Sequence, residues 1–112
     1  MNAWKMAAGL ALVCSAWVAQ AQAQAPAQAP VQDAQLARNL AATCANCHGT
    51  NGQARGDMRP LAGMAAERIV ATMADYKRGA QSGTIMPQIA KGYTDEQIRL
   101  VAGYFAAQPA QK

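Results

Sequence analysis

The stretch TCANCHGTNG, residues 43–52, carries two cysteines and the only histidine of a 112-residue chain within five consecutive positions. On an α-helix, positions i, i+3 and i+4 project from the same side. Cys44, Cys47 and His48 would therefore present two sulfur atoms and one imidazole to a single object. The rest of the fold is expected to bring that object against this turn.

The N-terminal segment, residues 1–23, is typical of a secretory signal peptide rather than of a folded element. Lys5 gives it a positive start, and the apolar run at residues 6–19 is too short to span a bilayer comfortably. The run ends in AQAQAQA, which has the small-residue spacing that signal peptidase requires for a cut after Ala23. We expect export to an oxidising compartment outside the cytoplasm. A lipid anchor on Cys14 is the alternative.

The chain that would remain after cleavage is small and poor in bulky apolar residues. Its large side chains are Phe105 and three tyrosines, set among many alanines. A domain of this size usually needs a disulfide, a metal or a cofactor to be stable. The formal net charge of +4, one unit of which leaves with Lys5, is too weak to indicate nucleic-acid binding. A large apolar group is therefore expected to complete the core.

A linker and three main helices are predicted after the signal peptide. Residues 24–32 are rich in Pro, Ala and Gln and lack periodicity, which indicates a linker before a single domain at residues 33–109. The helices are expected at residues 33–48, 65–78 and 94–105. Asp33 is the predicted N-cap of the first, and Thr94 is predicted to form a capping box with Gln97 at the last. The sequence predicts a small all-α domain.

A haem is the group that best explains the turn at residues 44–48. Two thiols can add to the two vinyl groups of a haem as thioethers, and the neighbouring imidazole can reach the iron. C-x-x-C-H is the attachment pattern of c-type haem, and no cysteine is left over once Cys14 leaves with the signal peptide. We expect one covalent haem c on Cys44 and Cys47, with His48 as an iron ligand.

Two other sites fit these residue types less well. A structural zinc site needs four ligands, and the expected mature chain offers no Cys or His beyond these three. A redox-active C-x-x-C disulfide is typical of a βαβ setting, whereas these cysteines end a helical stretch. Both interpretations are kept as alternatives to the haem.

A methionine is expected on the second face of the iron, because His48 is the only histidine. Methionines next to or within the helix at residues 65–78 are expected to pack in the core. Met58 follows His48 too closely to wrap to the opposite face of a haem. Met86 lies in a loop that Pro87 is expected to hold extended, and it is the predicted ligand.

These motifs resemble those of class I c-type cytochromes, the small haem-bearing electron carriers of the bacterial periplasm. CANCHGTNG is similar to their attachment segment, and TIMP to the segment that bears the methionine ligand. RPLAG is similar to the loop whose proline carbonyl orients the ligating histidine. The resemblance covers about residues 33–107 and implies a cytochrome c fold with three main helices around the haem. It also implies a periplasmic location and Pro60 as the partner of His48.

A narrower resemblance covers MADYKRGAQSGTIMPQIAKGYTDEQIRLVAGYFAAQ, residues 73–108. This segment is similar to the haem subunits of flavocytochrome c sulfide dehydrogenases and to one half of the dihaem cytochromes c4. The resemblance implies a one-electron carrier without catalytic residues, whose partner is a redox protein such as a flavoprotein dehydrogenase subunit. A carrier to a terminal oxidase, as in cytochromes c4, is the alternative. A five-coordinate haem enzyme is a further one, should Met86 leave the iron free.

A docking surface for that partner is predicted beside the Met86 loop. Lys77, Arg78 and Lys91 bracket the loop and would form a basic rim around an apolar contact made by Ile85, Pro87 and Ile89. The same three basic residues could equally serve only to keep a small protein soluble.

Overall fold

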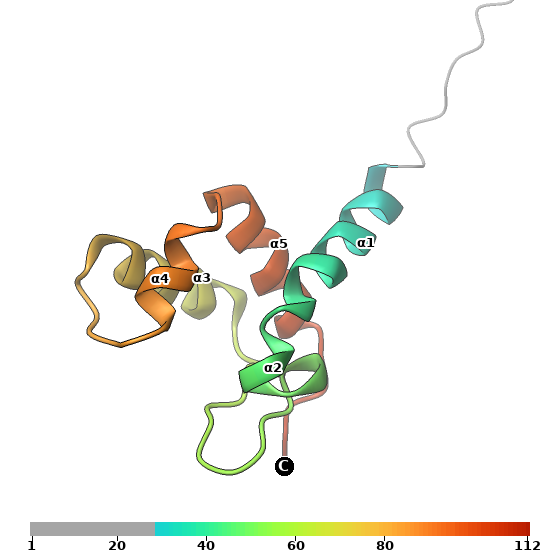
Figure 1. Ribbon diagram of the computed structural model, residues 1–112. Helices are drawn as coiled ribbons and strands as arrows, with labels where there is room; N and C mark the ends of the chain where they lie inside the picture. The colour runs from blue at the N-terminus through green and yellow to red at the C-terminus, as the bar shows by residue number, and fades with distance from the viewer. Residues whose placement is uncertain (1–28) are drawn as a thin grey trace, which may run out of the picture.

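The computed structural model describes residues 29–112, and side chains from Asp33 onward. The expected signal peptide, its cleavage site and the start of the predicted linker lie outside the described residues. Within them the secondary structure is helical, without strands (Figure 1), which confirms the predicted all-α class. The elements are α1 (Ala29–Ala42), α2 (Ala45–His48), the 3₁₀ turn η2 (Thr50–Gly52), α3 (Ala66–Arg78), α4 (Met86–Lys91) and α5 (Asp95–Ala106). None of these helices is long and apolar enough to cross a membrane.

The first helix differs from its prediction at both ends. It begins at Ala29 rather than at Asp33, so residues 29–32 form its first turn instead of a linker. Pro30 is compatible with that position, because the first turn of a helix needs no backbone N–H donor there.

The helix also stops at Ala42 instead of running on to His48. The Cys44 amide bonds to the Ala41 carbonyl at 3.1 Å, and the Thr43 hydroxyl donates to the Leu40 carbonyl at 3.0 Å. A threonine hydroxyl competes in this way with the helical backbone pattern. The attachment turn, residues 44–48, therefore contains a separate short helix, α2.

The later helices follow their predictions closely. Gly79 ends α3 in the left-handed conformation, with φ of 75°. At the start of α5, Gln97 donates its amide to the Thr94 hydroxyl at 3.1 Å, and Thr94 donates its amide to the Gln97 side chain at 2.9 Å. The predicted capping box is confirmed.

The extended conformation predicted at Met86 is wrong. Met86 is the first residue of α4, and Pro87 stands within its first turn. The reason is the same as at Pro30: a proline early in a helix has no N–H to satisfy and already holds a helical φ. Met86 therefore sits on a short helix rather than on a loop.

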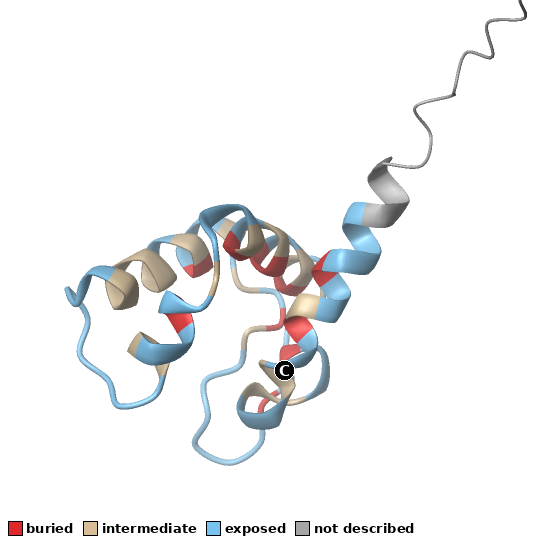
Figure 2. Cartoon of the chain, turned by 45° about the horizontal axis from the view of Figure 1, so that its top comes forward, coloured by how far each residue is buried: buried red, intermediate tan, exposed pale blue. Residues whose placement is uncertain are grey.

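The core lies where α1, α3 and α5 meet, and Figure 2 shows the buried positions gathered on α5 and on the facing end of α1. Phe105 is the one large side chain that is fully buried, at 1% exposure, among those described. Its buried neighbours are Ala41, Ile69, Val101 and Ala102. Several larger apolar side chains surround this cluster but are only partly buried. The chain thus has a small core, and the apolar side chains beside it remain partly exposed.

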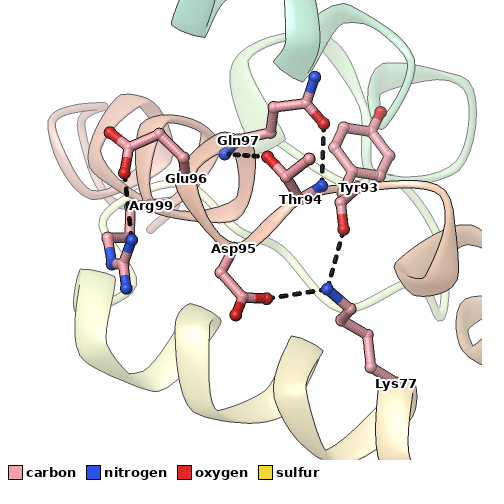
Figure 3. A network of polar contacts seen from close by, with 7 residues as sticks. All are labelled: Lys77, Tyr93, Thr94, Asp95, Glu96, Gln97 and Arg99. Carbon is pink, nitrogen blue, oxygen red and sulfur yellow. Dashed lines mark hydrogen bonds and ion pairs between the residues drawn. The ribbon is translucent and has the colours of Figure 1, made fainter.

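Lys77 ties the end of α3 to the start of α5 (Figure 3). Its ammonium group donates to the Tyr93 carbonyl at 2.9 Å and pairs with the Asp95 carboxylate at 2.8 Å. This hydrogen bond and the positive charge of Lys77 lower the pKa of Asp95 below its usual range. The Asp95 carboxylate is therefore ionised at neutral pH.

Gly52 brings the attachment segment directly onto the core. Its φ is +77°, and a β-carbon there would lie 2.7 Å from the Ala62 nitrogen and 2.8 Å from the Phe105 ring. The Gly52 carbonyl accepts the amides of Leu61 and Ala62 at 2.9 and 3.1 Å. The backbone at Gly52 is thus in direct contact with Phe105 and with the 61–62 segment.

We predict that Gly52→Ala destabilises the protein more than Gly56→Ala. Gly56 also has a positive φ, of +63°, but a β-carbon there would meet nothing within 4 Å. In both variants the strained backbone conformation should lower the free energy of unfolding by about 1–2 kcal/mol. Overpacking should lower that of Gly52→Ala by about 1–3 kcal/mol more. Urea unfolding of the haem-loaded variants measures the difference. Equal losses would contradict the close approach to Phe105.

Candidate haem site

A cavity of about 640 Å³ adjoins the small core. It is lined by residues of α2, α3, α4 and α5 and by the segments between the helices. Apolar wall residues include Leu61, Met64, Ile69, Met73, Ile98 and Val101. Its volume lies in the range of roughly 300–1,000 Å³ that is usual for pockets enclosing a small molecule or cofactor. The uncovered apolar surface of the fold therefore faces a space large enough for a cofactor.

The turn that carries the C-x-x-C-H pattern lines this cavity with all three of its reactive side chains. The amides of Cys47 and His48 both bond to the Cys44 carbonyl, at 3.3 and 2.9 Å, so the segment completes one helical turn. Neither cysteine is in a disulfide. Burial raises the pKa of the half-buried Cys44, whereas Cys47 is exposed. The structure thus brings the two sulfurs and the imidazole to one wall.

His48 is oriented by a backbone carbonyl. Its Nδ1 lies 2.7 Å from the carbonyl oxygen of Arg59. A carbonyl can only accept, so Nδ1 carries the proton, and Nε2 of the neutral ring keeps a free lone pair. This is the arrangement in which a histidine can ligate a metal through Nε2.

The prediction that Pro60 orients His48 is wrong by one residue. The accepting carbonyl belongs to Arg59, and Pro60 is exposed and is not among the residues that line the cavity. Both residues share the peptide bond that contains this carbonyl. The ring of Pro60 restricts the backbone of the residue before it, so Pro60 influences the orientation of His48 through Arg59.

Four methionines line the cavity: Met58, Met64, Met73 and Met86. Met64 and Met73 also pack against the buried cluster, as expected of core residues. Met58 is 44% exposed and directly precedes Arg59, whose carbonyl contacts His48, so it belongs to the histidine side of the cavity. Met86 comes from α4, which packs on α3 and stands apart from α2 in Figure 1. Of the four, Met86 is best placed to approach from the wall that does not carry His48.

Arg59 is the only charged side chain among the lining residues. Sequence reasoning missed it, although it stands inside the RPLAG motif. Sequence reasoning also missed Tyr93 and Thr43, which line the cavity beside Cys44. No periodicity marks these positions, because their contacts are tertiary.

The residues present fit a haem. The wall is apolar, two thiols stand at the spacing that thioether attachment requires, and His48 offers a nitrogen lone pair. A methionine thioether faces the same space from another helix.

Residues 31–105 match the protein family described as "Cytochrome C oxidase, cbb3-type, subunit III". The chain belongs to this family of c-type cytochromes. Its relatives are named as cytochromes, so the bound group is covalent haem c and the protein is an electron carrier rather than an enzyme.

Three relatives show which c-type cytochromes this chain is similar to. It is 41% identical over 66 residues to the cytochrome subunit of sulfide dehydrogenase from Chlorobaculum tepidum, a match that covers 59% of this chain and 60% of that protein. It is 32% identical to cytochrome c-554(548) of Halomonas halodenitrificans, covering 68% of this chain and 96% of the relative. Cytochrome c4 of Pseudomonas aeruginosa is 31% identical, covering 68% of this chain and 38% of the relative. The resemblances to the sulfide dehydrogenase subunit and to cytochrome c4 are confirmed.

We predict that the haem is held through Cys44 and Cys47. The haem should stay with the polypeptide on acid–acetone extraction, and the intact mass should exceed that of the exported chain by one haem. Cys44→Ala combined with Cys47→Ala should release it, because both thioethers are then lost. Cys14→Ala is the matched control and should retain the haem. Haem that extracts freely from the unaltered protein would contradict the attachment.

Proposed function

We propose that this cytochrome is a periplasmic one-electron carrier, with His48 and Met86 as iron ligands and a flavoprotein dehydrogenase as electron donor. The observation that carries the proposal is the hydrogen bond from His48 Nδ1 to the Arg59 carbonyl, which leaves Nε2 available on a residue that lines the cavity. Met86 faces the same cavity from α4. The signal-like character of residues 1–23 supports the periplasmic location.

The chain's own residues favour electron transfer over bond-making chemistry. Bound haem supplies one-electron exchange at its iron. If His48 and Met86 both hold the iron, the protein would leave no coordination position for a substrate. The apolar wall lowers the local dielectric, and the half-buried Met86 helps to keep water away from the ligand positions.

The relatedness to cytochrome c4 supports a second version of the same function. In that version the partner is a terminal oxidase, to which the cytochrome passes electrons, and not a flavoprotein. The likeness to a sulfide dehydrogenase subunit, at 41% identity, favours the flavoprotein.

We predict that Met86→Ala abolishes the near-infrared sulfur-to-iron charge-transfer band of the ferric protein and lowers its midpoint potential. Loss of a thioether, which favours ferrous iron, is the physical reason. Met58→Ala is the control, because Met58 lines the same cavity from the histidine side. The control should keep the band. If the band persists in Met86→Ala, a residue other than Met86 ligates the iron.

The expected basic rim is largely neutralised within the chain. Lys77 is held by the Tyr93 carbonyl and by Asp95, and Arg78 pairs with Asp75. Of the three predicted rim residues, Lys91 is in no ion pair among the described residues. A positive ring around the Met86 helix is therefore a poor basis for docking.

An exposed apolar surface is better supported at the same place. Ile85 and Ile89 are 61% and 38% exposed, and both also line the cavity. Met58 belongs to the same set, at 44% exposure. Large exposed apolar side chains at the mouth of a cofactor cavity are typical of a contact surface. We therefore propose that the flavoprotein docks on this apolar surface.

We predict that Ile89→Asp slows reduction of the ferric protein about tenfold, the cost of a charge within an apolar contact. The probe is the flavoprotein subunit of a sulfide dehydrogenase, reduced with sulfide and followed by stopped flow. Leu36→Asp is the matched control, since Leu36 is 45% exposed on α1 and does not line the cavity. The rate with the unaltered cytochrome should change little with ionic strength. Strong slowing by salt, with Ile89→Asp unaffected, would restore the electrostatic rim.

A further inference from the structure

Tyr93 connects three helices beside the cavity through hydrogen bonds of its backbone amide, its carbonyl and its hydroxyl. Its amide donates to the Ala90 carbonyl at the end of α4, at 3.3 Å. Its carbonyl accepts the Lys77 ammonium of α3 at 2.9 Å (Figure 3). Its hydroxyl lies 2.5 Å from the Thr43 hydroxyl and 3.3 Å from the Leu40 carbonyl, at the end of α1. The ring itself lines the cavity.

The end of α1 needs these hydroxyl groups. In a continuing helix the Leu40 carbonyl would accept the Cys44 amide, but that amide bonds to Ala41 instead. The Thr43 hydroxyl donates to the carbonyl that this break leaves free, and the single proton of the Tyr93 hydroxyl goes either to the same carbonyl or to the Thr43 oxygen. The Leu40 carbonyl has two lone pairs, so it can accept from Thr43 and still offer Tyr93 an acceptor on the α1 side.

The helix that carries Met86 needs a tether. It spans six residues, Met86–Lys91, too few to be stable on its own. The segment before it, residues 79–85, is exposed throughout. Local opening concentrates in short elements of this kind, next to exposed segments. At the C-terminal end of α4, Ala90 is fully buried, and Tyr93, two residues after Lys91, adds hydrogen bonds to α3 and α1.

We propose that Tyr93 is a positioning residue that fastens α4 to the end of α1 beside Cys44 and so sets how readily Met86 leaves the haem iron. This inference rests on the proposed ligation by Met86. Neither of the other tyrosines occupies such a place. Tyr104 donates to Asn51 at 2.7 Å and does not line the cavity, and Tyr76 accepts a hydrogen bond from Gln81, five residues ahead in the chain.

Imidazole binding to the purified ferric protein tests the proposal, because imidazole must displace Met86 to reach the iron. Tyr93→Phe keeps the ring and removes the hydroxyl. We expect the charge-transfer band to remain without imidazole, and the apparent imidazole affinity to rise about fivefold, the size expected for one lost hydrogen bond. Tyr104→Phe loses a comparable hydrogen bond away from the cavity and should leave the affinity unchanged. Urea unfolding of both variants compares their global stabilities.

Thr43→Val removes the other hydroxyl of the same contact. It should raise the imidazole affinity by a similar factor, and the double variant should rise no further, because both changes break one connection. If Tyr93→Phe does not load haem, Thr43→Val alone can be used to test the proposal. An unchanged affinity in both single variants, with the band present, would overturn the role of Tyr93 and leave Met86 ligation intact. A band that persists in Met86→Ala would overturn both proposals, which separates the two failures.

Discussion

The fold depends on an apolar volume that its own side chains do not fill. Phe105 is the only large side chain that is fully buried among the described residues, and its nearest buried companions include two alanines. The cavity of about 640 Å³ beside this cluster has a wall of Leu, Ile, Val and Met. Roughly 25 cal/mol of stability is gained for each Å² of such surface removed from water. Covalent haem c bound in this cavity would complete the core as well as supply the redox centre.

This constraint explains why the chain is organised around backbone contacts at the cavity edge. Gly52 has no side chain, so the attachment segment can rest on Phe105. The Gly52 carbonyl then holds the 61–62 segment, which follows the loop whose Arg59 carbonyl orients His48. Core packing and histidine orientation are therefore connected through a few adjacent peptide groups.

The sequence predicted those elements whose signals are local. The capping box of Thr94 and Gln97 and the end of α3 at Gly79 depend on residues within one turn, and both were found. The C-x-x-C-H turn is equally local, and its three side chains do share one wall of the cavity.

Tertiary contacts decided the features that the sequence did not predict. The break at Thr43 is stabilised by a hydroxyl from Tyr93, fifty residues away in the chain. The carbonyl of Arg59 rather than Pro60 faces His48, and only the folded loop distinguishes two adjacent carbonyls. The rim charges at Lys77 and Arg78 are paired with carboxylates, a pairing that a sequence pattern does not reveal.

The two sides of the cavity are restrained in different ways. On the histidine side, one short hydrogen bond to a backbone carbonyl fixes the imidazole, and the residues involved lie eleven apart in the chain. On the methionine side, α4 packs on α3, and Tyr93 adds hydrogen bonds to α3 and α1, over separations of up to 53 residues. The Arg59 carbonyl lies in an exposed segment, and α4 likewise follows the exposed residues 79–85. On the proposed ligation by Met86, the two iron ligands would be held by unlike means: His48 by a backbone carbonyl, and Met86 by a short helix whose following residue, Tyr93, is hydrogen-bonded to α3 and α1.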